Sequence, residues 1–253
     1  MSVKNNRNLE NQLREQAGLV YYDRGEIKGE GGMHYQRLAI QTHFVQKGED
    51  QAQLVERYVK PLYQHGDALS FGAKVMGMCV GNVKTREEVK PGFWAKLLWR
   101  FAGVNSTGIG MHEPYKLQLV IDMVGLPRFL LAVFLSAVTK PFGLKGVFYR
   151  VCGKGVGGID GFYERSSFDV YHEMAVINPD NPDALCDELF QKTGIPVVLM
   201  DANDIQRDQL GKSQGFPLTD SQIQDALRDN PSGQGDELTP FILIRQVDKA
   251  SAK

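Results

Sequence analysis

Short apolar runs bounded by glycine and polar residues recur along the chain and alternate with stretches of helical spacing. Short runs between turn signals are typical of buried strands. Strands are therefore expected within 35–45, 68–80, 146–151, 194–200 and 241–244. Apolar residues at every third or fourth position predict helices over 51–63, 93–101, 115–124, 127–138, 179–192 and 219–228. This alternation predicts an α/β (mixed α+β) fold with a mixed sheet.

The two ends of the chain lack this pattern. Residues 1–33 are polar, first rich in asparagine and then in glycine and charge, and are expected to form an N-terminal extension. Residues 34–245 carry the apolar pattern and form the expected main domain, and residues 246–253 are a polar tail. A length of 253 residues suits one large domain or two small lobes.

Charge and cysteine content narrow the class of protein. The formal net charge is −1, so the chain lacks the electrostatic footprint of a nucleic-acid-binding protein. Its three cysteines are far apart and include no CxxC pair, which argues against a zinc site and a disulfide framework. Cys79 and Cys152 lie in apolar or glycine-rich runs and are expected to be buried, inert thiols. The polar first 16 residues lack a secretion signal, so a cytoplasmic location is expected.

The strongest apolar stretch covers residues 129–138. It is shorter than the roughly 20 residues needed to span a bilayer, so no membrane span is expected. We interpret it as a buried helix that begins near Pro127. A contact with a membrane surface is the alternative.

Two aspartates stand at the ends of strand-like runs. Asp160 follows 146–151 and a glycine cluster, and Asp201 follows 194–200. In open α/β sheets, ligands bind at the carboxyl ends of strands, where a carboxylate can hold a hard cation and, through it, phosphate. Asn203 and Asp204 follow closely and are further candidate metal ligands. The alternative is that each aspartate caps a helix or shapes a turn.

The glycine cluster at 153–158 contains a formal GxGxxG pattern. Gly161 weakens any helix that follows, which disfavours a dinucleotide-binding fold. A glycine-lined turn that shapes a ligand site, formed by Gly155, Gly157 and Gly158, is the preferred interpretation. Arg150 lies within the apolar run before it, where burial would require a carboxylate or phosphate partner.

The order of these motifs resembles the coenzyme F-420 (deazaflavin):γ-glutamyl ligase family. The matching segments are Gly48-Glu49-Asp50, Gly66-Asp67 followed by Lys74 and Gly81, Gly157-Gly158-Ile159-Asp160, and Val197-Val198-Leu199-Met200-Asp201. The resemblance extends from about His34 to about Leu210 and implies the family's two-lobed fold and an intertwined homodimer.

The resemblance implies an acid–amino-acid ligase of coenzyme biosynthesis. Such an enzyme joins L-glutamate to the carboxylate of a deazaflavin acceptor, with GTP (or ATP) as co-substrate and Mg²⁺ or Mn²⁺ as cofactor. Asp160 and Asp201 match the metal-binding acids, Lys74 matches the first lysine of the strand turn, and lysine or arginine, here Lys74 and Arg150, would steady the oxyanion. Lys74, Gly81 and the three glycines would contact the nucleotide. A folate- or pterin-like carboxylate is another acceptor for the same scaffold.

Three positions depart from the family pattern. Met78 stands in place of the second lysine, Ala202 follows the second metal aspartate, and Tyr163 replaces an expected asparagine. The later nucleotide loop also has no evident counterpart. These departures motivate the alternative function, a non-catalytic paralogue that binds a nucleotide or small anion.

Overall fold

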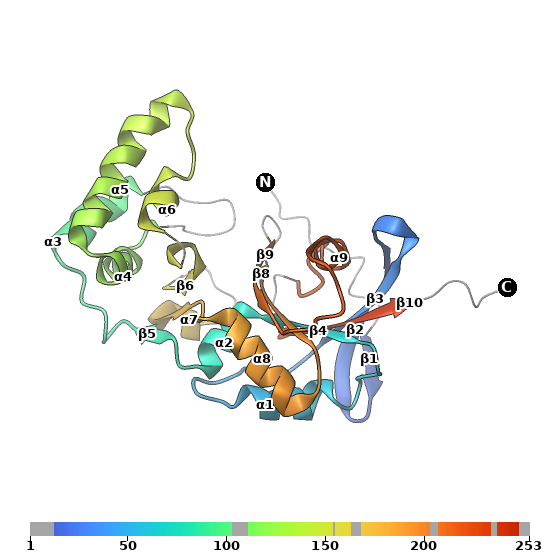
Figure 1. Ribbon diagram of the computed structural model, residues 1–253. Coiled ribbons are helices and arrows are strands. Elements are labelled where there is room, and N and C mark those ends of the chain that lie inside the picture. Colours follow the sequence, from blue (N-terminus) through green and yellow to red (C-terminus); the bar gives the residue numbers. More distant parts are fainter. Residues whose placement is uncertain are drawn as a thin grey trace. The chain divides into compact units, whose positions relative to one another are not determined.

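The computed structural model describes residues 13–102, 111–153, 155–162, 168–202, 207–233 and 237–247. The chain divides into two compact units (Figure 1). The first contains Met1–Gly81 and Pro179–Lys253, and the second contains Asn82–Asn178. Their strands and helices confirm the predicted mixed α/β class.

Within the described residues, the first unit has a seven-stranded mixed sheet in the order β1-β2-β3-β10-β4-β8-β9. The strands are β1 (Leu13–Gln16), β2 (Leu19–Lys28), β3 (His34–Ile40), β10 (Phe241–Val247), β4 (Ala68–Gly72), β8 (Val197–Ala202) and β9 (Arg207–Lys212). β4 and β8 are parallel, and the other neighbouring pairs are antiparallel. Parallel neighbours require a long crossover connection, and here the chain passes through the second unit and α8 (Pro182–Thr193) between them.

One row of side chains crosses the four central strands. Ile40 of β3 is in register with Phe241 of β10, which is in register with Phe71 of β4, which is in register with Leu199 of β8. The rings of Phe71 and Phe241 meet edge to face at 4.7 Å. Because β10 is antiparallel to both neighbours, β3, β4 and β8 run in the same direction. Their carboxyl ends therefore meet along one edge of the sheet, which we call the carboxyl edge.

Helices cover both faces of this sheet (Figure 1). On one face lie α1 (Gln51–Leu54), its π-helical continuation η3 (Val55–Val59), α2 (Ala73–Cys79) and α8. On the other face, α9 (Asp220–Ala226) packs Ile223 and Ala226 against Val198 and Met200 of β8. Three of the predicted helical positions, over 51–63, 179–192 and 219–228, are confirmed. The strand predicted within 68–80 ends at Gly72, and the second half of that run is wrong because it forms α2.

Residues 13–28, expected within an N-terminal extension, form the hairpin β1–β2, and β2 pairs with β3. Apolar alternation did not reveal β2 because one of its buried positions is Arg24. The Nε of Arg24 donates to the carbonyl of Pro231 at 2.9 Å, and its guanidinium lies 4.8 Å from the ring centroid of Tyr22. At the other end, β10 continues to Val247, two residues into the expected tail.

The second unit has an antiparallel sheet in the order β5-β7-β6. Its strands are β5 (Val83–Thr85), β6 (Ile159–Gly161) and β7 (Met174–Ile177). Its helices are α3 (Phe93–Leu98), η4 (Trp99–Phe101), α4 (Pro114–Val124), α5 (Leu126–Thr139), η5 (Lys140–Phe142), α6 (Val147–Cys152), η6 (Val156–Gly158) and α7 (Val170–Glu173). Leu117, Val120, Phe129, Phe162 and Ala175 lie in its hydrophobic core.

The strand predicted at 146–151 is wrong, because this segment forms α6. Its β-branched and aromatic residues favour a strand locally. The ring of Phe148 instead meets Phe129 of α5 edge to face at 6.0 Å, so tertiary packing overrides propensity. A short apolar run cannot by itself distinguish a strand from a buried helical turn.

The helix predicted over 127–138 begins at Leu126, but the prediction that it is buried is wrong. Phe129 and Ala132 are buried, whereas Leu131, Phe134 and Val138 are exposed. Among the described helices, none is individually long and apolar enough to cross a membrane. The segments Pro114–Val124 and Leu126–Phe142 together have the required length and composition, but they meet at a bend of 118°.

Candidate functional site

The carboxyl edge of the first unit brings Lys74 and Asp201 to neighbouring strands. Gly72, the last residue of β4, is in register with Met200 of the parallel strand β8. Lys74 lies two residues later, in the first turn of α2, and Asp201 lies one residue after Met200. Helix α2 packs on both β4 and β8. Lys74 and Asp201, which are far apart in sequence, therefore both lie at the carboxyl edge.

The two residues also share one face of the sheet. Side chains alternate along a strand, and Val198 and Met200 point to the α9 face. Asp201 therefore points to the opposite face, where α2 carries Lys74. Both residues are half-buried. At the ends of parallel strands, a lysine can contact a phosphate group, and a carboxylate can hold the divalent cation that accompanies the phosphate.

Asp208 is an additional acid at this edge. It is the direct cross-strand partner of Asp201 in the antiparallel pair β8–β9. Directly opposite residues project to the same face, with Cβ atoms about 5 Å apart. Sequence reasoning missed Asp208 because its position depends on where the chain reverses between the two strands. Asn203 and Asp204, the other predicted metal ligands, lie outside the described residues.

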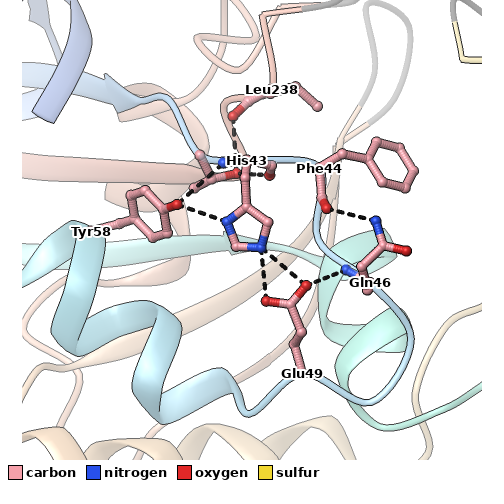
Figure 2. A network of polar contacts seen from close by, with 7 residues as sticks. His43, Phe44, Gln46, Glu49, Tyr58 and Leu238 are labelled. Carbon is pink, nitrogen blue, oxygen red and sulfur yellow. Dashed lines mark hydrogen bonds and ion pairs between the residues drawn. The ribbon is translucent and has the colours of Figure 1, made fainter.

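A histidine network lies beside this edge, just after β3 (Figure 2). The Nδ1 of His43 is 2.7 Å from the hydroxyl of Tyr58, and its Nε2 is 2.8 and 3.0 Å from the carboxylate oxygens of Glu49. The carboxylate of Glu49 also accepts the N–H of Gln46. His43 and Tyr58 were not singled out from the sequence, because a spacing of 15 residues matches no catalytic motif.

The chemistry of the two partners determines which hydrogen bonds the ring nitrogens of His43 can make. An ionised Glu49 can only accept, so Nε2 of His43 carries a hydrogen. Nδ1 then accepts from the Tyr58 hydroxyl when the ring is neutral, or donates to it when the ring is charged. Both ring nitrogens are thus engaged, and the network fastens the segment between β3 and α1. The N–H of Gly48 in that segment donates to the carbonyl of Met78 at 2.9 Å, which ties it to α2.

The other motif residues of the first unit have structural partners. Asp50 caps α1 by accepting from the N–H groups of Ala52 and Gln53 at 2.8 and 2.9 Å. Gly81 has φ +78° and closes the turn after α2, where its N–H donates to Met78. Met78, where the resemblance led us to expect a second lysine, is buried in the core at 2% exposure.

The remaining predicted site residues belong to the second unit. Asp160 is exposed in β6, and Gly155 and Gly157 are exposed beside it. A Cβ on Gly158 would lie 2.2 Å from Nδ2 of Asn178, so close packing explains this glycine. The prediction that Arg150 is buried is wrong, because it lies exposed in the last turn of α6.

The prediction that Cys79 and Cys152 are buried thiols is confirmed, and Cys186 is buried as well. Cys79, Cys152 and Cys186 are free and buried. Burial raises the pKa of Cys79 and of Cys186 to about 12, and in both cases nearby carboxylates add to the effect. None of these thiols has the electropositive, accessible surroundings of a nucleophile.

The donor set limits how a metal ion could be held. Within the described part of the chain, no group of three or more His, Cys, Asp or Glu side chains could hold a metal ion. Asp201 and Asp208 provide two opposed carboxylates. That number suits Mg²⁺, which is usually held by one or two carboxylates together with water and substrate phosphates. The residues fit a shared metal–phosphate site and do not form a closed protein cage.

Comparison with known proteins adds no constraint on the function. No protein-family model matches the chain, and no curated protein sequence matches it significantly. The carboxyl edge and the order of the motifs are therefore the features of this chain that bear on its function.

Proposed function

We propose that this chain is an amide-bond-forming ligase that adds L-glutamate to a carboxylate acceptor, with GTP or ATP as co-substrate and Mg²⁺ or Mn²⁺ as cofactor. The acceptor would be a deazaflavin coenzyme or a folate- or pterin-like molecule. The observation that carries the proposal is the placement of Lys74 and Asp201 on one face at the ends of the parallel strands β4 and β8.

The chemistry of the reaction accounts for these residue types. A carboxylate is a poor acyl donor, so its oxygen first attacks the γ-phosphorus of the nucleotide and the nucleoside diphosphate leaves. The glutamate amine then attacks the acyl phosphate, and inorganic phosphate leaves as the amide forms. The ammonium of Lys74 would stabilise negative charge on the transferring phosphoryl group. Asp201 and Asp208 would hold a divalent ion, which neutralises phosphate charge when bound.

His43 has a positioning role in this proposal. Both of its ring nitrogens are already engaged, so it is not a free base. It holds the segment between β3 and α1 beside α2, which carries Lys74. The proposal also includes the two-lobed ligase fold, with the two units as lobes, and a cytoplasmic homodimer.

A non-catalytic paralogue that binds a nucleotide or small anion is the second candidate. It is favoured by the burial of Met78 at the position of the family's second lysine. A protein of this kind would bind its ligand without a requirement for metal and without turnover.

A thermal-shift titration separates the candidates. GTP, ATP and buffer are each tested with and without Mn²⁺ on the wild type, on Asp201→Asn, and on Glu56→Gln as a control that removes one carboxylate charge from η3. A ligand at 100 times its dissociation constant stabilises the folded state by about 2.7 kcal/mol.

We expect a metal-dependent shift that Asp201→Asn loses and Glu56→Gln keeps, followed by glutamate-dependent release of phosphate with an accepted carboxylate. A metal-independent shift without turnover would support the paralogue. The absence of any shift would contradict both candidates.

A further inference from the structure

An apolar stripe faces solvent along α5 and η5 of the second unit. Phe134 and Val138 follow Leu131 by three and seven residues, so these three share one side of α5. Phe142 of η5 and Leu144 just after it are also exposed. In chain order, the exposed fractions of the five side chains are 51, 63, 47, 79 and 55%. The opposite side of α5 packs Phe129 and Ala132 into the core. We call these five exposed residues the α5 stripe.

Helix α3 of the same unit repeats this arrangement. Ala95 is buried, whereas Phe93, Trp94, Leu97 and, in η4, Phe101 are exposed. Single exposed apolar residues need no explanation, but sets of large ones mark interaction surfaces. The second unit therefore exposes large apolar side chains that do not pack into its own hydrophobic core.

The sequence around the α5 stripe contains several basic residues and no acidic ones. Between Asp122 and Asp160 the sequence contains Arg128, Lys140, Lys145, Arg150 and Lys154 and no aspartate or glutamate. Arg128 precedes the stripe by one helical turn, and Lys145 directly follows Leu144. Arg128, Lys140 and Lys145 are exposed. This local excess contrasts with a net charge of −1 for the whole chain.

We propose that the α5 stripe docks on the surface of an anionic phospholipid bilayer. Its aromatic and aliphatic side chains would enter the boundary between headgroups and acyl chains, and the basic side chains would contact lipid phosphates.

The charge distribution favours a lipid surface over a second copy of this chain. In a twofold dimer through the stripe, the basic residues Arg128, Lys140 and Lys145 of one copy would lie near the basic residues of the other, which is repulsive. An anionic bilayer attracts the same residues. The inference is independent of the reaction proposed for the first unit, so either can fail alone.

Vesicle flotation of the full chain tests the proposal. Vesicles of phosphatidylcholine alone and of phosphatidylcholine with phosphatidylglycerol are compared at low and high salt. The variant Leu131→Ser with Phe134→Ser removes stripe residues, and Leu13→Ser is the matched control, because Leu13 of β1 is 57% exposed. Lys140→Glu with Lys145→Glu removes basic residues, and Lys47→Glu in the first unit is its control.

We expect the wild type to float with the anionic vesicles and to dissociate as salt rises. The double serine variant should lower the partition coefficient by about tenfold or more, because two large apolar side chains no longer enter the interface. The double glutamate variant should lose the preference for anionic lipid, and both controls should float like the wild type. Circular dichroism checks that the variants remain folded, which is expected because the altered side chains are exposed.

Three results would each overturn the proposal. The first is a wild type that floats with neither kind of vesicle, and the second is a double serine variant that floats as well as its control. The third is a dimer, measured by light scattering, that the double serine variant dissociates while flotation is unchanged, since that would make the stripe a protein interface.

Discussion

Arg245 and Asp67 form a bidentate ion pair that joins β10 to the turn before β4. The Nε of Arg245 lies 2.9 Å from Oδ1 of Asp67, and its Nη2 lies 2.7 Å from Oδ2. Asp67 is 1% exposed, and its Oδ2 also accepts the N–H of Gln64 at 2.8 Å. The aspartate of the Gly66-Asp67 motif is therefore used to hold the fold together.

Asp67→Ala is expected to destabilise the protein by about 3–5 kcal/mol, because removing one partner leaves the guanidinium of Arg245 without its charge partner in a mostly buried position. Urea denaturation measures this difference. Glu188→Ala is the control: it breaks the exposed pair with Lys192, which water screens, and should therefore cost far less stability. Equal losses for the two variants would contradict the role of Asp67.

Met78→Lys is expected to lower the melting temperature strongly, because the core position would have to accept an ammonium group without a partner. Met78→Leu, which nearly conserves volume, should cost less than about 1.5 kcal/mol. Calorimetry or a thermal shift compares the two. A lysine variant as stable as the wild type would show that this position of α2 accepts a charge, and it would weaken the paralogue alternative.

Gly161→Ala is expected to destabilise the second unit by about 2 kcal/mol or more, because φ is +136° and a Cβ would lie 2.2 Å from the carbonyl oxygen of Met174. Gly157→Ala provides the control, since nothing lies within 4 Å of its Cβ position. That change should stay within about 0.5 kcal/mol. Chemical denaturation of both variants decides whether backbone packing between β6 and β7 requires Gly161.

The folded protein is expected to resist thiol reagents at pH 8. Burial raises the pKa of Cys79 and Cys186 to about 12, so very little thiolate forms at this pH. Labelling with Ellman's reagent should be slow in buffer and should reach all three cysteines in denaturant.

The same pKa shifts predict how stability depends on pH. Because the pKa is raised in the folded state, the thiol of the unfolded chain ionises first, at its ordinary pKa of 9.0. The free energy of unfolding should therefore fall as pH rises from about 9 toward 12. Rapid labelling of the native state at pH 8 would contradict the burial of these thiols.

The pattern of residues alone was sufficient to predict those features of the fold that depend on contacts between residues close in sequence. Asp50 predicts the start of α1 because its side chain caps N–H groups two and three residues away. Pro182 predicts the start of α8, and the placement of Asp201 at the end of β8 follows from one apolar run and the polar residues after it. The mixed α/β class follows from the alternation of such elements.

Tertiary structure decided everything that depends on partners distant in sequence. In the segment 146–151, Phe148 of the observed helix packs against Phe129. Strand β2 joins the sheet by pairing with β3, and its buried Arg24 donates to the carbonyl of Pro231. Asp208 faces Asp201 only through strand register, and Lys74 joins them only because β4 and β8 are parallel neighbours. Register and strand order arise from long-range packing, and a local pattern of polar and apolar residues does not encode them.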